Sequence, residues 1–543
     1  MSDTIRNGAW AEFDGLVIGA GQHGLILAAY LSRAGLRVAV LERRPEEGGA
    51  MSTWESAPGV FHNLATHYKM HDGPILRDLE LERYGVEFLF PDLKTVVPGD
   101  GSQAPPLLHF AADPDRTAAS IARFSSRDAG TFRESFPMWN DWYERFVLPE
   151  IYRPPEPAAV TEGRIAAQPG GPEYLHARAV PVDTWFRELF ETDLLRALLL
   201  WMSNTSTYSS GGLSTMAMHA FLSWLVRRTG VVRGGSRQFA RALTRLITAN
   251  GGQVFTNADV VEITVDSGRA TGIRLSDGRT IRASRFVASA VDVKQTLLRL
   301  VDDAVLDPAL VDRIRAFRLD QNSLFGVHLV LSEPLRYRAQ RANPEIARSL
   351  RYIIGMDGTA DLVAEREAAR EGRLPDEGLV LMTGNPSRQD PSLARPGAHT
   401  AYAWVMVPAR LRDTGIEGWD DIAEATADRV IDTWAPATEN LSAATILHRR
   451  LTTPLELQRS FVNMTDGGIN MGLLSPEQSG INRPAPELSG YRTPIEGLYL
   501  AGSSSHPGGQ LTGANGYNAA RRIAEDLEIE PWWPEQAPIG ERT

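Results

Sequence analysis

Three glycines between a predicted strand and a predicted helix constrain this chain most. Residues 14–19 (DGLVIG) read as a buried parallel strand, and 23–35 (HGLILAAYLSRAG) read as an apolar helix. Gly19, Gly21 and Gly24 give the spacing G-x-G-x-x-G at their junction. Glycines there allow a tight turn and let a pyrophosphate approach the N–H groups at the start of the helix. The stretch therefore predicts a dinucleotide-binding βαβ unit.

The next predicted strand narrows the choice of dinucleotide. Residues 36–42 (LRVAVLE) end in Glu42, an acid placed to accept hydrogen bonds from ribose hydroxyls. An acid at this position is compatible with NAD or FAD and disfavours the 2′-phosphate of NADP. We find no second glycine-rich fingerprint, because 352–358 (YIIGMDG) lacks a helical pattern after it. One fingerprint suits a flavoprotein that keeps its FAD.

The continuation of this stretch resembles a known signature. Residues 42–49 (ERRPEEGG) are similar to the E-x-R-x-x-x-G-G pattern of the FAD-binding group that includes amine oxidases and phytoene desaturases. We expect Arg44 to supply a cation near the dinucleotide, and Gly48 and Gly49 to let a loop run against it without side chains in the way.

The C-terminal part carries the sharpest resemblance. Residues 497–520 contain GLYLAG, HPGG and NAA, and they resemble the closing signature of phytoene desaturase-type FAD oxidoreductases. This implies that Gly502, Gly509 and Gly513 lie at the flavin, and the similar segment 260–263 implies that the backbone of Val260 meets the adenine. Within this superfamily the chain is most similar to the branch of pyridine nucleotide-disulfide oxidoreductase domain-containing protein 2. The sequence has no cysteine, so disulfide chemistry is excluded.

The resemblance implies an α/β fold. We expect a Rossmann-type FAD-binding domain, like those of glutathione reductase and amine oxidases, with a mixed α+β substrate domain. The expected division places FAD-binding parts at 1–100, 229–300 and 491–543, the last including a C-terminal tail. A helical substrate or lid region would occupy 101–228, and the substrate domain 301–490.

The implied activity is that of an FAD-dependent dehydrogenase or desaturase. A hydride would pass from a hydrophobic, isoprenoid or lipid-like substrate to flavin N5, and oxygen, a quinone or another carrier would reoxidise the flavin. A flavin-dependent isomerase or saturase and an FAD-retaining interaction protein are the alternatives. Phytoene desaturases have Arg where this chain has Ala50, and Asp where it has Asn63, so a carotenoid substrate is placed in question.

The candidate catalytic residues are histidines and a tyrosine. Residues 62–71 (HNLATHYKMH) gather four such groups near the predicted flavin, and we favour His67 or Tyr68 for orienting substrate or moving a proton. These side chains could instead hold a loop in place through hydrogen bonds to its backbone. His506 is either a polar wall of the site or a loop-fixing side chain. No metal is expected, because carboxylates are missing near these histidines.

Charge and hydropathy limit the partners. The formal net charge of −11 speaks against nucleic acid. The N-terminus has no apolar signal core and no window approaches a membrane span, which predicts a cytoplasmic protein. Peripheral membrane contact stays open, because the apolar stretch 216–226 precedes Arg227 and Arg228, although we favour a core position or a tunnel wall for this stretch. Trp532 and Trp533 suggest docking on the same chain or in an oligomer.

Overall fold

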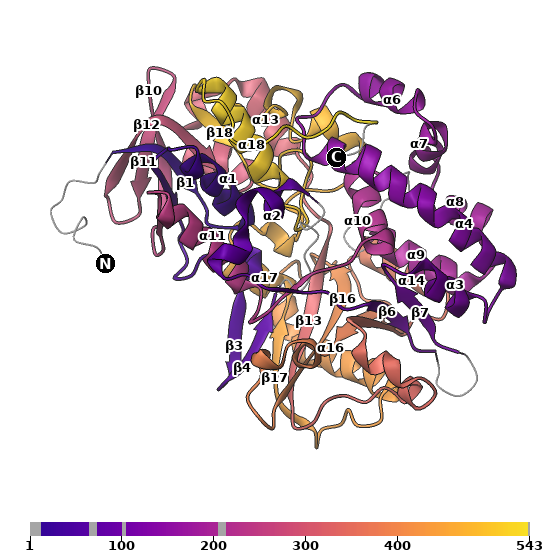
Figure 1. The fold of residues 1–543 in the computed structure, drawn as a ribbon. Coiled ribbons are helices and arrows are strands. Elements are labelled where there is room, and N and C mark those ends of the chain that lie inside the picture. The colour runs from indigo at the N-terminus through magenta and orange to yellow at the C-terminus, as the bar shows by residue number, and fades with distance from the viewer. Residues whose placement is uncertain (1–11, 65–72, 100–104, 205–212, 541–543) are drawn as a thin grey trace.

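Two large sheets and a group of helices surround the middle of the molecule (Figure 1). The computed structural model describes residues 12–64, 73–99, 105–204 and 213–540. Within these residues, no helix is long and apolar enough to cross a membrane.

The first sheet is the predicted Rossmann-type sheet. Its strands follow the order β10-β11-β12-β1-β2-β9, and β18 also pairs with β12. β1 pairs in parallel with β2 and β12, and β18 pairs in parallel with the end of β12. The strands are β1 (Phe13–Ile18), β2 (Val38–Leu41), β9 (Gln253–Phe255), β10 (Val260–Asp266), β11 (Arg269–Leu275), β12 (Thr280–Ser289) and β18 (Leu498–Leu500).

Both faces of this sheet are covered, which is why β1 and β2 are continuous apolar runs. Val17 and Val40 pack on one face with residues of α1 (Gln22–Arg33), α11 (Arg237–Ala249) and α18 (Ala514–Asp526). Leu16 and Ile18 pack on the other face with α13 (Pro308–Ala316). The α/β fold expected from the resemblance is confirmed.

The second sheet is mostly antiparallel. Its order is β17-β13-β16-β15-β14-β6-β7, and only β14 and β6 pair in parallel. One face packs against α16 (Trp419–Trp434), whose two end tryptophans are buried. The strands are β6 (Leu93–Val97), β7 (Leu107–Phe110), β13 (Asn322–Leu331), β14 (Arg351–Ile354), β15 (Leu381–Gly384), β16 (His399–Pro408) and β17 (Ile446–Thr452).

Two strands of the second sheet come from far earlier in the chain than the rest. β6 falls inside 1–100 and β7 inside 101–228, yet they extend the sheet formed by residues 322–452. The expectation that no helical pattern follows 352–358 was wrong, since α14 (Thr359–Arg370) begins there. This helix contains many charged residues, which obscured the helical spacing of its apolar residues in the sequence. β14 nevertheless pairs antiparallel with β15 and belongs to no second dinucleotide fold.

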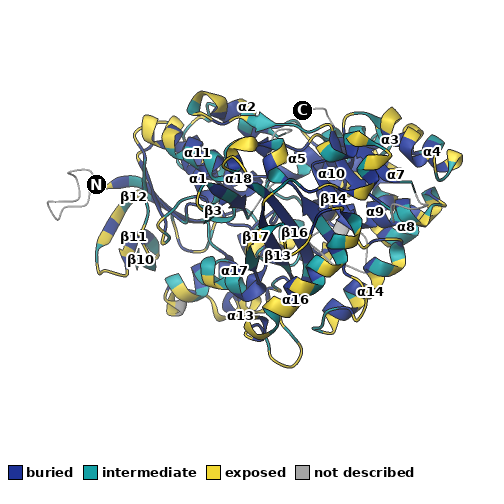
Figure 2. Ribbon diagram, turned by 90° about the horizontal axis from the view of Figure 1, so that it is seen from below, coloured by how far each residue is buried: buried dark blue, intermediate teal, exposed yellow. Residues whose placement is uncertain are grey.

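The helical group lies beside both sheets. It comprises α3 (Pro114–Ile121), α4 (Ser126–Trp142), α5 (Leu148–Ile151), α6 (Ala158–Ala166), α7 (Gly171–Ala179), α8 (Val182–Leu189), α9 (Asp193–Asn204) and α10 (Thr215–Val226). Every residue of α10 is buried, and Figure 2 shows it in dark blue while α3 and α4 carry exposed positions. Arg227 and Arg228 pair with Glu144 and Asp92. α10 therefore belongs to the core and presents no apolar face outward.

The tryptophan pair docks on this chain. Trp533 is buried against the ring of Tyr30 in α1, and the indole N–H of Trp532 donates to the carbonyl oxygen of Tyr30 at 3.1 Å. Farther on, the N–H of Gly540 donates to the carbonyl oxygen of Arg145 at 2.7 Å. The C-terminal segment thus joins the first sheet's helices to the helical group.

Candidate active site

The glycine-rich turn after β1 leaves open space at the start of α1. Gly21 has ordinary extended backbone angles, and a Cβ built on it would have no neighbour within 4 Å. A Cβ on Gly24, by contrast, would lie 2.0 Å from the carbonyl oxygen of Gly19. Gly24 is therefore needed for close packing of the turn. Gly21 instead keeps clear a cradle that a pyrophosphate would fill at the helix N-terminus.

Glu42 is fixed at the carboxyl end of the neighbouring strand. Its side chain is buried, and its two carboxylate oxygens accept hydrogen bonds from the N–H of Ala20 at 3.0 Å and of Arg44 at 2.9 Å. The carbonyl oxygen of Glu42 accepts from the N–H of Ala258, two residues before Val260 at the start of β10. The carboxylate is thus held beside the glycine turn, where a ribose would lie.

The second glycine pair packs directly on the first turn. The N–H of Gly48 donates to the carbonyl oxygen of Ala20 at 2.8 Å, and its φ of 119° requires glycine. A Cβ on Gly49 would lie 3.1 Å from the Cα of Gly21. The guanidinium of Arg44 lies over the ring of Phe461, with its Cζ 4.4 Å from the ring centroid, and burial lowers its pKa.

The C-terminal loop closes this cradle from a third side. It follows β18 at Gly502, and Gly513 caps the N-terminus of α18 with a φ of 73°. A Cβ on Gly509 would lie 2.5 Å from the Cα of Asn470. Nε2 of His23 in α1 and Oγ of Ser503 are 3.1 Å apart. The motifs from both ends of the chain therefore meet at one place.

A cavity of about 310 Å³ extends from the cradle into the space between the two sheets. Its cradle end is formed by the glycine turns and the C-terminal loop, and its other end by the second sheet and nearby helices. The cradle end is lined by Gly21, Gln22, His23, Gly48, Gly49, Ala50, Met51, Ala290, Ser503, Gln510 and Leu511. The remaining lining residues are Leu64, Trp201, Trp224, Leu324, Val380, Met382, Trp404, Met406, Leu457, Phe461, Asn463, Met464, Ile469, Asn470 and Met471.

Outside the cradle, the lining of this cavity is apolar and uncharged. Its polar side chains are the amides of Asn463 and Asn470, together with the indole N–H groups, and the rest are methionine, leucine and aromatic groups. Among the described lining residues of the whole cavity there is no carboxylate, lysine or arginine, and the only titratable side chain is His23. Burial lowers the pKa of His23 to about 3, so it is neutral at physiological pH.

The favoured catalytic pair, His67 and Tyr68, lies outside the described residues. The nearby His62 is described, and it is a buried side chain held by Oγ of Ser56 at 2.7 Å and the carbonyl oxygen of Leu329 at 3.2 Å. Burial lowers the pKa of His62 to about 4. These contacts match the loop-bonding alternative for His62.

His506 makes a contact that holds the C-terminal loop. Its Nε2 lies 3.0 Å from the carbonyl oxygen of Glu150, and the carbonyl oxygen of His506 accepts hydrogen bonds from Tyr491 and Asn515. A catalytic role for His506 stays a prediction, as do the cofactor contacts of the glycines, Glu42, Arg44 and Val260.

Sequence reasoning missed a buried cation that holds the C-terminal loop. The guanidinium of Arg483 donates to the carbonyl oxygens of Ser503 at 2.8 Å and Ser505 at 3.3 Å, and to those of residues 472, 473 and 478. Burial lowers the pKa of Arg483 to about 10. No local pattern marks such a residue, because its partners come from distant turns.

Several related proteins align with nearly the whole chain. A limonene dehydrogenase component of Castellaniella defragrans is 30% identical over 96% of this chain and 96% of its own length. Pyridine nucleotide-disulfide oxidoreductase domain-containing protein 2 of Rattus norvegicus is 30% identical over 95% and 94%. The lycopene-forming phytoene desaturase of a Paracoccus species is 26% identical over 92% and 95%.

Residues 24–383 match the model of a family described as flavin containing amine oxidoreductases. The open space at Gly21, the fixed carboxylate of Glu42 and the adjoining cavity fit FAD. The chain therefore belongs to the flavin containing amine oxidoreductase family and is an FAD-dependent oxidoreductase of the phytoene desaturase-like kind.

Proposed function

We propose that this protein oxidises an apolar, isoprenoid-like substrate at a C–H bond. One observation carries the proposal: the cavity that begins at the cofactor cradle continues into a wall of methionine, leucine and aromatic side chains. Such a wall binds an apolar body by removing its surface from water.

Bound FAD would supply the hydride acceptor for this reaction. The chain's own residues would exclude water and orient the substrate, since hydride transfer depends on position and a dry site more than on a strong acid or base. Met382, Trp404 and Met406 form the wall on the second sheet. The amides of Asn463 and Asn470 bond within the chain, to Sδ of Met471 at 2.7 Å and to Oδ1 of Asp320 at 3.1 Å, and so they hold the lining in place.

The relatives support the same substrate class. One is named for limonene and another for phytoene, and both compounds are isoprenoids. We also propose that oxygen, a quinone or another carrier accepts the electrons from the reduced flavin.

The cavity favours this function over amine oxidation. A substrate ammonium placed in a buried apolar site needs an opposite charge or strong acceptors. The described lining offers no carboxylate, and only its indole faces could attract a cation. A neutral substrate has no such requirement.

Anaerobic titration of the flavoprotein tests the proposal. The purified protein should show a flavin absorption spectrum that bleaches with a monoterpene hydrocarbon or alcohol and does not bleach with putrescine or cyclohexylamine. Bleaching by amines alone would reject it. A flavin that stays oxidised while product forms would instead identify the isomerase alternative, and one that stays oxidised with no product from any isoprenoid would favour the interaction role.

A further inference from the structure

A buried arginine lies directly behind the apolar end of the cavity. Arg351, the first residue of β14, has no exposed surface. Its Nε donates to Oγ1 of Thr95 at 2.8 Å. Within the described part of the chain, its Nη1 and Nη2 atoms have no hydrogen-bond partner and no carboxylate forms an ion pair with it. Buried cations are normally paired, so this guanidinium lacks an anion.

Strand register places Arg351 on the cavity side of the second sheet. Ile353 pairs with Met382, Met382 with Trp404, and Leu324 with Met406. Paired residues share a face, and so do residues two apart on one strand. Arg351 is therefore on the same face as Met382 and Trp404, both of which line the cavity.

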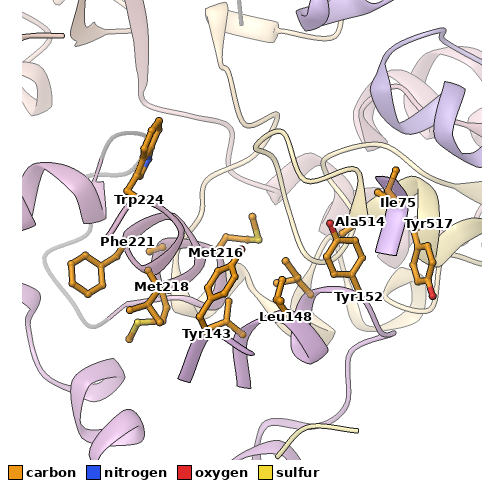
Figure 3. Packing of buried hydrophobic residues seen from close by; sticks show 14 of the residues in the cluster. Ile75, Tyr143, Leu148, Tyr152, Met216, Met218, Phe221, Trp224, Ala514 and Tyr517 are labelled. Atoms are coloured by element: carbon orange, nitrogen blue, oxygen red, sulfur yellow. The ribbon is translucent and has the colours of Figure 1, made fainter. Parts of the chain in front are cut away.

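Two tryptophans contact both this guanidinium and the cavity. Cζ of Arg351 lies 3.5 Å from the ring centroid of Trp224 and 5.0 Å from that of Trp201. Both indoles also line the cavity. Figure 3 shows the indole of Trp224 extending from α10 beyond the cluster around Met216 and Tyr143. A ligand in the cavity therefore reaches the terminal nitrogens only if one of these rings turns aside.

The surroundings of Arg351 favour an anion. Burial lowers its pKa to about 9, which leaves it cationic at neutral pH, and Tyr402 is the group that opposes this lowering. Nζ of Lys94, bonded to the carbonyl oxygens of Ser223 and Arg227, lies 4.9 Å from the same Trp224 ring. Two buried cations thus flank one cavity-lining indole.

We propose that Arg351 binds a carboxylate at the end of the substrate remote from the flavin. The planar fork of Nη1 and Nη2 matches the two oxygens of a carboxylate. This inference rests on the proposed function and narrows it: the substrate, or its product, would be an apolar isoprenoid-like body that carries an acid group.

Ligand binding to the holoenzyme tests this site without turnover if the flavin is first reduced with dithionite, because a reduced flavin cannot accept a hydride. The probes are geranate and its neutral methyl ester, and the readout is the heat of binding during anaerobic calorimetric titration. We expect the wild-type protein to bind geranate at least tenfold more tightly than the ester. Equal affinities would overturn the proposal without any variant.

Variants then assign the preference to one side chain. Arg351→Met should remove the preference for geranate, and Arg351→Lys should keep part of it because the charge remains. Arg348→Met, three residues earlier on the exposed surface, is the matched control and should keep the full preference. An unchanged preference in Arg351→Lys and Arg351→Met, or in whichever of them folds, would overturn the assignment.

The two proposals fail in different ways. An Arg351-dependent preference for geranate with no flavin reduction by any isoprenoid, neutral or acidic, would reject the oxidation and leave the binding site standing. Flavin reduction by a neutral isoprenoid with equal binding of acid and ester would reject only the carboxylate site.

Discussion

At the scale of single residues, the cofactor cradle depends on side chains whose contacts are with backbone. Glu42 accepts from two N–H groups, and Arg483 donates to carbonyl oxygens of several turns. The role of Glu42 could be predicted, because dinucleotide-binding folds place an acid at a set distance in sequence after the glycines. Arg483 and Arg351 were not, because their partners are brought together only by the fold.

Replacing Glu42 tests its assignment to the ribose. Glu42→Ala removes the acceptor for the hydroxyls and leaves the N–H of Ala20 unpaired, which costs about 1–3 kcal/mol. We expect FAD to dissociate roughly 10–100 times more readily. The flavin-to-protein absorbance ratio after gel filtration measures this.

Glu47→Ala is the control for that change. Glu47 lies in the same loop, is only partly buried and forms no ion pair within the described residues. It should retain full flavin. A Glu42→Ala protein that also purifies with full flavin would contradict the ribose assignment.

At the scale of elements, the strand–turn–helix units were predictable and the second sheet was less so. β1, α1 and β2 follow from a continuous apolar run, a glycine spacing and a second run. The second sheet was harder to predict, because β6 and β14 become neighbours only through pairing between residues more than two hundred positions apart. The methionine-rich wall of the cavity carries no sequence signal for the same reason.

Two glycines of one turn should respond differently to the same added methyl group. In Gly21→Ala the methyl enters open space and the backbone angles suit alanine, so the apoprotein should keep its melting temperature while FAD binding weakens at least tenfold. Thermal unfolding and flavin titration of the apoprotein measure both quantities.

Gly24→Ala provides the contrast. Its methyl would meet the carbonyl oxygen of Gly19 at 2.0 Å, so the free energy of unfolding should fall by about 1–3 kcal/mol before any cofactor is added. Equal melting temperatures for the two apoproteins would show that the turn does not have this geometry.

At the scale of the whole molecule, segments that are far apart in the sequence pack against each other and stabilise the fold. The C-terminal segment packs Trp533 on Tyr30 and bonds Gly540 to Arg145. Docking of the tryptophan pair could be expected from composition, but its location could not, because the receiving surface is built from α1 and the helical group.

Removing the buried indole should loosen this connection. Trp533→Ala should lower the free energy of unfolding by about 3–5 kcal/mol, because a large buried ring leaves a cavity. Trp532→Ala should cost less, since Trp532 is only partly buried. Denaturant unfolding measures both, and an equal loss for the two variants would contradict the difference in burial.

Buried histidines make stability dependent on pH. Burial lowers the pKa of His109 to about 3, against 6.5 for an unperturbed histidine. Below pH 6.5 the unfolded chain therefore takes up a proton that the folded chain does not. The free energy of unfolding falls as the pH drops from 6.5 toward 3, by up to about 1.4 kcal/mol per pH unit for this side chain.

His109→Gln isolates this contribution. Glutamine can still donate to the carbonyl oxygen of Leu225, which lies 2.9 Å from Nε2 of His109, but it does not titrate. The fall in melting temperature between pH 7.5 and pH 5 should be smaller in the variant than in the wild type. Parallel curves would show that His109 titrates normally in the folded protein.

The order of strands in the first sheet also has a consequence for synthesis. β1 and β2 come from the first fifty residues, β9 to β12 from the middle and β18 from residues 498–500, and the loop after β18 completes the cofactor cradle. Because the ribosome synthesises these strands in that order, the unpaired backbone edge at the end of β12 stays exposed until β18 has been made. Flavin can therefore meet a complete cradle only after the loop that follows β18 has been synthesised.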